Sequence, residues 1–228
     1  MTGPVLSRRA TVVIAGAFGS GKTEVAINYA IACTAARRRV CLVDLDVVTP
    51  YFRVGDYREN LERRGVCVVA PPRGLAQFEL PALPPNIAGA LDEPELHVVL
   101  DVGGDPTGAR LLALYADRIE DRGYDLWVVA NPFRGPTPGA EALAAQARAT
   151  ASAAGLQLTG IVANPHLGDA TRPADIASGL QQVRRAAQAL GAPLVMLALA
   201  SGIAPSPEVE SLPVLPLQLT VRLPWQSP

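Results

Sequence analysis

Hydrophobic residues fall into two kinds of segment that alternate along this chain from near its start to about residue 200. Short runs rich in valine, isoleucine and leucine, without polar interruption, are typical of strands buried on both faces of a parallel sheet. The longer segments between them carry apolar residues at helical spacing, as at Val25, Ile27, Ala30 and Ile31. This alternation predicts an α/β fold, with a mostly parallel, doubly wound sheet and helices on both faces.

The same pattern gives each element an approximate position. Strands are expected at 11–15, 40–43, 66–69, 96–100, 126–130, 158–163 and 193–199. Helices are expected at 23–36, 56–64, 108–122, 139–154 and 173–190. Residues 71–85 form a proline-rich connection, too long for a simple turn, that would suit a lid or a partner surface. The tail from Pro205 is punctuated by prolines and allows one edge strand around 217–221.

Length and charge narrow the classes of protein. A chain of 228 residues can bury one sizeable core, so we expect a single domain over 1–228, with its core at about 10–200 and a tail at about 205–228. A net charge of −1 and no basic tract longer than three residues disfavour non-specific nucleic-acid binding. No run of eighteen apolar residues occurs and the start lacks an apolar signal core, which predicts a cytoplasmic protein without membrane spans.

The three cysteines fit that location. Cys33, Cys41 and Cys67 are odd in number, lie far apart in the sequence and stand in apolar contexts. We therefore expect buried free thiols rather than metal ligands or disulfides.

One short motif carries the strongest chemical signal. The segment Gly16-Ala17-Phe18-Gly19-Ser20-Gly21-Lys22-Thr23 fits G-x-x-x-x-G-K-[ST] and lies between a predicted strand and a predicted helix. Lys22 is the only lysine among twenty basic residues, so an ammonium is kept where a compact charge must reach β- and γ-phosphates. The motif predicts a nucleoside-triphosphate site in which the Thr23 hydroxyl ligates Mg²⁺. Its expected nucleotide-binding residues are Gly16, Phe18, Gly19, Ser20, Gly21, Lys22, Thr23 and Glu24.

Acidic residues follow two of the predicted strands. Asp101 ends an apolar run, where a carboxylate can hold magnesium, and Gly104 follows in a D-x-x-G spacing that can sense the γ-phosphate. Asp44 and Asp46 end the second strand, which we expect next to the phosphate loop. Asp46, further out, is the better candidate for orienting a water or the magnesium shell. The alternatives are an ordinary turn after Asp101 and a solvated strand end at Asp44–Asp46.

A weaker signal in the sequence concerns which nucleotide base the site binds. Asn164 ends a strand before Pro165, where its carboxamide can both donate to and accept from an adenine edge. An ordinary turn asparagine before proline is the alternative. A guanine site of the N-K-x-D or T-K-x-D type is excluded because Lys22 is the only lysine, which favours ATP. His97 and His166 are expected to be structural.

Together, the phosphate loop, the Asp44/Asp46 pair with Pro50-Tyr51-Phe52-Arg53, and the segment Asp101–Asp105 resemble the MinD/ParA/CobQ-type ATPases of the SIMIBI class. They are similar in particular to stand-alone CobQ/CobB-like proteins described as cobyrinic acid a,c-diamide synthase-like. The resemblance covers about residues 10–200. It implies a Mg·ATP-binding switch with slow ATPase activity, stimulated by a protein partner that needs maturation or cofactor or metal loading. Lys22, Asp46 and Asp101 would be its catalytic residues, and Thr23, Asp46 and Asp101 its metal-binding ones.

The chain also departs from that family. Many members carry a second lysine at the position of Ala17, which reaches the partner subunit's site, so a homodimer of that kind would need another cation such as Arg53. Paired metal-binding cysteines and a glutaminase domain are absent from the sequence as well. A second hypothesis is an ATP-dependent ligase or phosphotransferase like dethiobiotin synthetase, with Arg53, Arg73 and Arg134 binding an anionic substrate. A third is a nucleotide-binding module that has lost hydrolysis.

Overall fold

A computed structural model describes residues 3–46, 54–71, 86–103, 106–134, 139–203, 209 and 212–219 of this chain. Eight strands form one sheet in the order β3-β2-β4-β1-β5-β6-β7-β8, and every neighbouring pair is parallel. The strands are β1 (Thr11–Gly16), β2 (Val40–Leu45), β3 (Val66–Val69), β4 (His97–Val102), β5 (Tyr124–Ala130), β6 (Gly160–Ala163), β7 (Leu194–Ala200) and β8 (Val214–Leu217). The predicted α/β class is confirmed, and the sheet is wholly parallel.

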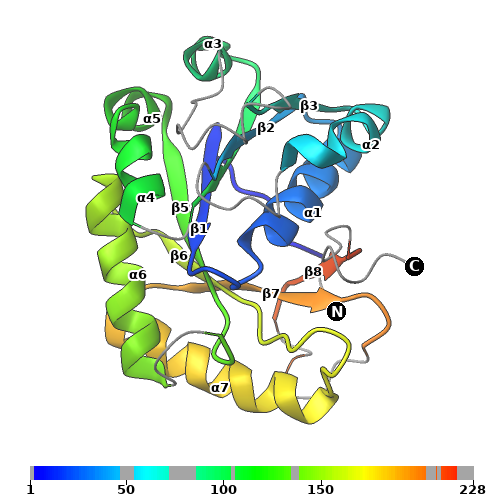
Figure 1. The fold of residues 1–228 in the computed structure, drawn as a ribbon, viewed down its shortest axis with the longest axis vertical. Coiled ribbons are helices and arrows are strands. Elements are labelled where there is room, and N and C mark those ends of the chain that lie inside the picture. The colour runs from blue at the N-terminus through cyan, green and yellow to red at the C-terminus, as the bar shows by residue number, and fades with distance from the viewer. Residues whose placement is uncertain are drawn as a thin grey trace.

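Helices cover both faces of this sheet (Figure 1). One face packs against α1 (Lys22–Ala35) and α2 (Arg58–Arg63), the latter preceded by the short 3₁₀ helix η1 (Val54–Tyr57). The other face packs against α3 (Ile87–Asp92), α4 (Pro106–Ala113), α5 (Ala116–Arg122), α6 (Ala140–Ala154) and α7 (Pro173–Leu190). Each face of the sheet has its own hydrophobic core, and alternate side chains of β1 pack into each. Val12 and Ile14 lie on the face of α1, whereas Val13 and Ala15 face the opposite helices.

The hand of the crossovers explains this division of the helices. From β1 the chain moves through β2 to β3, toward one edge of the sheet, and from β3 it moves back through β4 and β5 to β8 at the other edge. Parallel crossovers are right-handed, so reversing the direction of travel transfers the helices to the opposite face. The helix that follows β1 therefore packs on one face of the sheet. The helices that follow β4 and β5, the two neighbours of β1, pack on the other face. Such a switch point is where open parallel sheets bind ligands.

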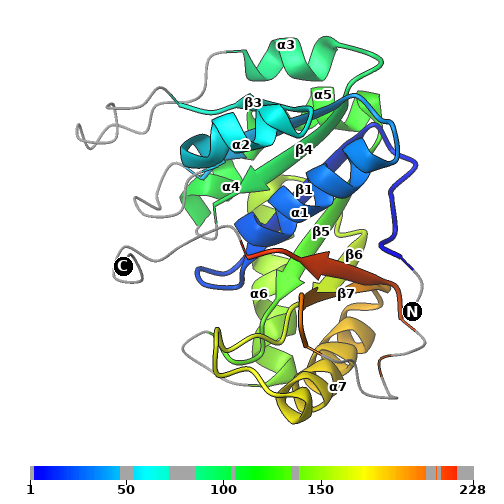
Figure 2. The ribbon, with the colours of Figure 1, turned by 90° about the vertical axis from the view of Figure 1, so that its right-hand side faces the viewer.

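Helix α1 is the most deeply enclosed helix, because the sheet wraps around it. It contacts β2 and β4 on one side and the edge strand β8 on the other (Figure 2). The carboxamide of Asn28 on α1 accepts a hydrogen bond from the Gln218 backbone N–H (2.9 Å) and donates one to the Gln218 carbonyl (3.3 Å). This pair of bonds ties the chain just after β8 to the helix that begins at the phosphate loop.

Three local predictions differ from the structure. The helix expected at 108–122 is two helices, α4 and α5, because the first packs against α6 and the second against α3. Helix α3 was not predicted, since six residues are too few for a clear helical period. The edge strand expected around 217–221 lies at Val214–Leu217 instead, with Pro216 exposed at the edge of the sheet, where a missing N–H removes no sheet bond. The expected lid at 71–85 lies outside the described residues except for Pro71.

The cysteine prediction was wrong for one residue. Cys33 and Cys41 are buried free thiols, but Cys67 is exposed, because β3 is an edge strand with alternate residues facing outward. Cys67 also lies close to Cys41 in space. It stands opposite Cys41 in the β2–β3 register, and the two Sγ atoms are 3.5 Å apart.

In the described part of the chain, no helix is long and apolar enough to cross a membrane.

Candidate functional site

The predicted phosphate loop joins β1 to α1 at the switch point of the sheet. Gly19 and Gly21 have φ values of 74° and 85°, in the left-handed region that favours glycine. A Cβ atom on Gly21 would also lie 2.3 Å from Nδ2 of Asn164, so a side chain at this position would displace the asparagine. The loop is closed by a hydrogen bond from the Ser20 N–H to the Ala17 carbonyl (3.1 Å). Its backbone thus bends as an anion-binding loop at a helix N-terminus must.

Lys22, the first residue of α1, is buried at the inner end of this loop. Its ammonium Nζ donates a hydrogen bond to Oδ2 of Asp46 over 2.7 Å, and both side chains are almost fully covered. The pair joins residues 24 positions apart, one after β1 and one after β2. The predicted phosphate-binding lysine therefore has a buried counter-ion.

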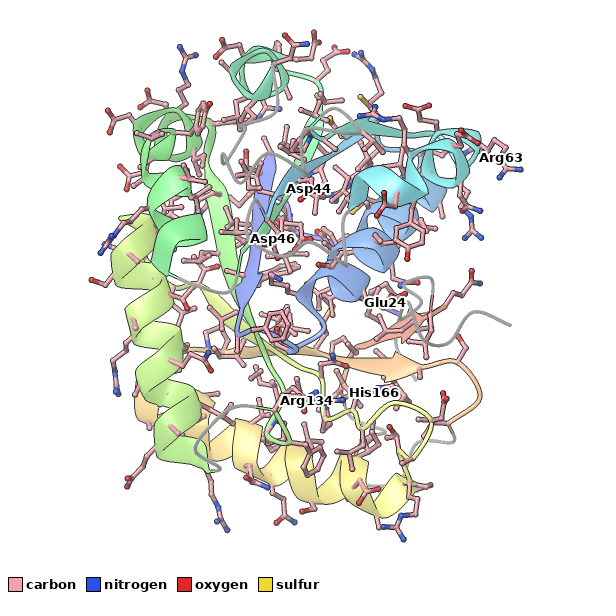
Figure 3. All side chains as sticks on the ribbon, in the orientation of Figure 1. Glu24, Asp44, Asp46, Arg63, Arg134 and His166 are labelled. Carbon is pink, nitrogen blue, oxygen red and sulfur yellow. The ribbon has the colours of Figure 1, made fainter. Side chains whose placement is uncertain are left out.

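Two more carboxylates lie beside this ion pair. Asp44 on β2 stands opposite Asp101 on β4 in the sheet register, and Asp44, Asp46 and Asp101 are all at most 2% exposed. The Asp46 backbone N–H donates to Oδ1 of Asp44 (3.1 Å), which fixes the direction in which the chain leaves β2. Both oxygens of Asp101 are buried without a hydrogen bond of good geometry among the described residues, and the Thr23 side chain lies near enough to lower the pKa of Asp101. Figure 3 shows Asp44 and Asp46 close together above the phosphate loop.

Burial dominates the electrostatics of this cluster. It raises the pKa of Asp44 to about 7, with the charge of Asp101 acting in the same direction. It raises the pKa of Asp101 to about 6, against the opposing effect of the Lys22 ammonium. Burial by itself lowers the pKa of Lys22, but the surrounding Asp101, Asp46 and Asp44 outweigh it and raise that pKa overall. The site is therefore a buried acidic cluster built around one ammonium group.

The structure decides one of the alternatives that the sequence leaves open. Asp44 and Asp46 do not form a solvated strand end, because both are buried. Asp101 is the next-to-last residue of β4, and the alternative of an ordinary turn after it stays open because residues 104–105 lie outside the described structure. The expectation that β2 adjoins the phosphate loop was wrong, since β4 lies between β1 and β2. Lys22 nevertheless reaches Asp46, because Asp46 follows the end of β2 and Lys22 follows the loop.

Asn164 touches the phosphate loop itself. Its Nδ2 donates a hydrogen bond to the Ser20 carbonyl over 2.7 Å, while its buried Oδ1 has no partner among the described residues. The adenine-contact role predicted for it stays a prediction.

A second asparagine supports the first and was missed from the sequence. Asn131 ends β5 as Asn164 ends β6, and its Nδ2 donates to the His166 carbonyl over 2.9 Å. The signal was present: the tripeptide Ala-Asn-Pro occurs at 130–132 and again at 163–165, at the ends of consecutive strands. The two loops form one unit beside the phosphate loop.

The remaining predicted residues are placed as follows. Phe18 is 69% exposed at the tip of the loop, whereas Ser20, Thr23 and Glu24 are buried. A Cβ atom on Gly16 would lie 2.7 Å from the Ser20 Oγ and from the Val129 carbonyl, so the loop packs tightly on β5. Glu24 accepts a hydrogen bond from Nδ2 of Asn28 (3.2 Å). Predicted residues outside the described structure are Gly104, Asp105, Arg73 and Pro50 to Arg53.

No cluster of three His, Cys, Asp or Glu side chains in the described residues is arranged to hold a metal ion. A nucleotide-bound magnesium does not require one, because Mg²⁺ keeps several waters and takes phosphate oxygens together with one or two protein ligands. Thr23 and the buried Asp101 are of the right chemistry for such a shared site.

No family model matches this chain, and no curated protein matches it. Solved structures do match. The cell division protein FtsY from Thermotoga maritima is 18% identical, with a TM-score of 0.56 over 92% of this chain and 66% of its own. The signal recognition particle receptor FtsY from Elizabethkingia anophelis is 17% identical, with a TM-score of 0.52 over 92% of this chain and 63% of its own. The signal recognition particle 54 kDa protein from Aeropyrum pernix K1, in complex with GDP, is 21% identical, with a TM-score of 0.52 over 85% and 42%.

At these identities the comparisons show the fold alone. This chain has the phosphate-loop α/β fold of those proteins and spans less than two thirds of the length of each. The narrower resemblance to CobQ/CobB-like proteins is not supported by them.

Proposed function

We propose that this chain is a Mg·ATP-binding switch protein with slow ATPase activity, stimulated by a protein partner. The observation that carries the proposal is the buried Lys22–Asp46 pair at the end of a phosphate loop, with Asp101 beside it. A buried ammonium surrounded by carboxylates contributes little to stability after desolvation, so its retention points to a ligand that uses the charge.

The residues present fit a magnesium ion bound with the nucleotide. Thr23 and Asp101 would hold it, Thr23 through its hydroxyl and Asp101 through the water shell, and Asp46 is a further candidate. The support for this assignment is that the two oxygens of Asp101 are buried without a well-formed hydrogen bond and that the Thr23 side chain lies beside them. When bound, the ion neutralises phosphate charge during phosphoryl transfer.

The chain's own groups perform the rest of the proposed work. Lys22 exchanges Asp46 for the β- and γ-phosphate oxygens when nucleotide enters the loop. Asp46, released from the ammonium, accepts a hydrogen bond from the attacking water and so orients it. Asp44 holds Asp46 in place through the Asp46 N–H. Release of the nucleotide returns Lys22 to Asp46, so this ion pair reports whether the loop is occupied.

Adenine is the proposed base. The sequence has no lysine for a guanine-reading motif, and Asn164 lies against the phosphate loop with a free buried acceptor. The bound GDP in a structural neighbour belongs to that protein and shows that the fold itself admits guanine. Base choice must therefore be measured on this chain.

A partner protein is proposed on weaker grounds. Two neighbours are a signal recognition particle receptor and a protein of that particle, so the fold serves proteins that act with others. The partner proposed here is an enzyme that needs ATP-driven maturation or cofactor or metal loading in the cytoplasm, and a homodimer is a further arrangement to test.

Calorimetric titration with ATP and GTP, each with and without Mg²⁺, tests the nucleotide proposal. We expect ATP to bind more tightly than GTP, and hydrolysis by the protein alone on the order of 10⁻³ to 10⁻² per second, as in other switch proteins. Thr23→Val should keep metal-free binding and lose most of the gain that Mg²⁺ gives. Lys22→Ala serves as the non-binding control, with circular dichroism to check its fold. Failure of the wild type to bind either nucleotide would falsify the proposal.

The rate of ATP turnover tests the two alternative hypotheses, a ligase or phosphotransferase and a nucleotide-binding module that has lost hydrolysis. Fast phosphate transfer that requires a small-molecule acceptor would favour the ligase or phosphotransferase. Tight ATP binding with no hydrolysis under any condition would favour a module that has lost activity.

A further inference from the structure

The loop after β5 places one arginine over the phosphate loop. Asn131 begins a tight turn in which its Oδ1 accepts from the Phe133 N–H (3.1 Å) and its carbonyl accepts from the Arg134 N–H (3.2 Å). The hydrogen bond from Asn131 to the His166 carbonyl ties this turn to the neighbouring loop after β6. The backbone that carries Arg134 is therefore fixed at both ends of the turn.

Helix α7 supports the turn from behind. A Cβ atom on Gly179 would lie 2.5 Å from Cβ of Pro165, 3.0 Å from Cγ of Pro132 and 3.1 Å from Cε2 of Phe133. Because Gly179 has no side chain, both Asn-Pro loops can pack directly against α7. Packing thus holds the loop that carries Arg134 and the loop that carries Asn164 in one arrangement.

Arg134 extends from this support across Gly19. Its Cβ, Cγ and Cδ atoms lie 3.8–4.0 Å from the position that a Cβ on Gly19 would take, so the aliphatic stem covers that residue. The side chain is exposed, and its guanidinium has no ion pair or hydrogen bond with any of the described residues. The nearby His166 adds no second positive charge beside Arg134, because burial and the charge of Arg134 both lower the pKa of its imidazole and keep it neutral (Figure 3).

The described charges around the phosphate loop leave little positive charge to bind a terminal phosphate. Lys22 is already matched by Asp46 and has Asp44 and Asp101 nearby, and Ala17 at the start of the loop is uncharged. A nucleoside triphosphate brings about four negative charges, and its outer phosphate lies at the open side of a phosphate loop. A guanidinium can bind two phosphoryl oxygens at once, which an ammonium cannot do with the same geometry.

We propose that Arg134 binds the terminal phosphate of the bound nucleoside triphosphate and so makes this site prefer triphosphate over diphosphate. The inference rests on the proposed function and adds a specificity-determining residue to that site. Arg134 acts within its own chain, from a loop held by Asn131 and Gly179, so the site needs no cation from a second subunit for this contact.

The test compares two affinities in each of four proteins. Calorimetry measures the Kd of a hydrolysis-resistant Mg·ATP analogue and of Mg·ADP for the wild type, Arg134→Ala, Arg134→Lys and the control Arg63→Ala. Arg63 lies on the surface of α2, far from the loop (Figure 3). We expect Arg134→Ala to weaken triphosphate binding about tenfold or more and diphosphate binding less than threefold. Arg134→Lys should fall between wild type and alanine, and Arg63→Ala should match wild type.

Each other outcome has a defined meaning. If Arg134→Ala weakens both nucleotides equally, or neither, while its thermal midpoint stays at the wild-type value, the assignment to the terminal phosphate is overturned. If the wild type binds neither nucleotide, the proposed function has failed instead. A lowered thermal midpoint with both affinities reduced would identify a structural role and also overturn the inference.

Discussion

At the scale of single residues, burial sets the chemistry of most groups that matter in this protein. Asp44, Asp46, Asp101 and Lys22 would be ordinary charged residues at a surface, but each is nearly inaccessible here. Lys22 keeps its charge because the neighbouring carboxylates outweigh the effect of burial on its pKa, whereas burial raises the pKa of Asp44 and Asp101, which hold their protons to higher pH than usual. The identity of these residues could be read from the sequence, but their ionisation depends on what covers them.

His97 gives the clearest pH dependence away from the site. It begins β4 beside the ring of Tyr29 (centroids 6.1 Å apart), and burial lowers its pKa to about 4, with Arg38 acting in the same direction. The folded protein therefore binds this proton more weakly than the unfolded chain. Stability from the neutral imidazole is complete above pH 6.5 and is lost as the pH falls from about 6.5 to about 4.

Replacing His97 by phenylalanine should remove that loss. The gap between the folded and unfolded pKa corresponds to about 3 kcal/mol at most. Urea unfolding at pH 8 and pH 4.5 should show a smaller decrease in the free energy of unfolding for His97→Phe than for the wild type. The exposed Glu95→Gln variant is the control and should follow the wild type. Identical decreases for wild type and His97→Phe would contradict the assignment.

At the scale of elements, two successive β–α connections share one design. β5 and β6 both end in an alanine that is followed by Asn-Pro, and in each loop the asparagine side chain is buried and hydrogen-bonded to a backbone carbonyl. The first asparagine binds the second loop, and the second binds the phosphate loop. The position of the phosphate loop therefore depends on contacts with the loops after β5 and β6, the next two strands of the sheet.

Asn164→Ala separates the two roles that Asn164 can have. Losing the hydrogen bond to the Ser20 carbonyl frees the loop and should weaken nucleotide binding about tenfold. If Asn164 only positions the loop, ATP and GTP should lose affinity equally. The proposed adenine contact predicts a larger loss for ATP. Competition binding with both nucleotides measures this difference, and Gln181→Ala on the exposed face of α7 is the control.

At the scale of the whole molecule, closure of the sheet around α1 is the main organising feature. β8 is the last strand in both sequence and sheet order, yet it packs against the helix that follows the first strand (Figure 2). The carboxamide of Asn28 joins the two by pairing with the backbone of Gln218 in both directions. The C-terminal strand thereby supports the helix that carries Lys22.

Asn28→Ala should show how much this tie contributes. The change leaves the Gln218 N–H and carbonyl without their partner and should lower the free energy of unfolding by about 1–3 kcal/mol. Chemical unfolding of the nucleotide-free protein measures the effect. Gln181→Ala, which removes an exposed carboxamide, should change stability by less than about 0.5 kcal/mol. Equal stability of wild type and Asn28→Ala would rule out the tie as a stabilising contact.

Most strands and helices, and the phosphate loop, could be predicted from the sequence because they depend on neighbouring residues. Apolar runs determined the strands, and the spacing of glycines before Lys22 determined the loop. Helix α3 and the break between α4 and α5 could not be predicted, since they depend on which helices pack together. The exposure of Cys67 depends on β3 being an edge strand, which no local pattern reveals.

The sequence by itself determined that this protein has a phosphate loop with one lysine, and which acids end the neighbouring strands. Only the tertiary structure decided that β4 lies between β1 and β2, that Lys22 pairs with Asp46, and that Arg134 covers Gly19. The physical reason is the range of the interactions. A loop conformation follows from consecutive residues, whereas these contacts join segments dozens of residues apart, whose meeting is set by strand order and by the hand of the crossovers.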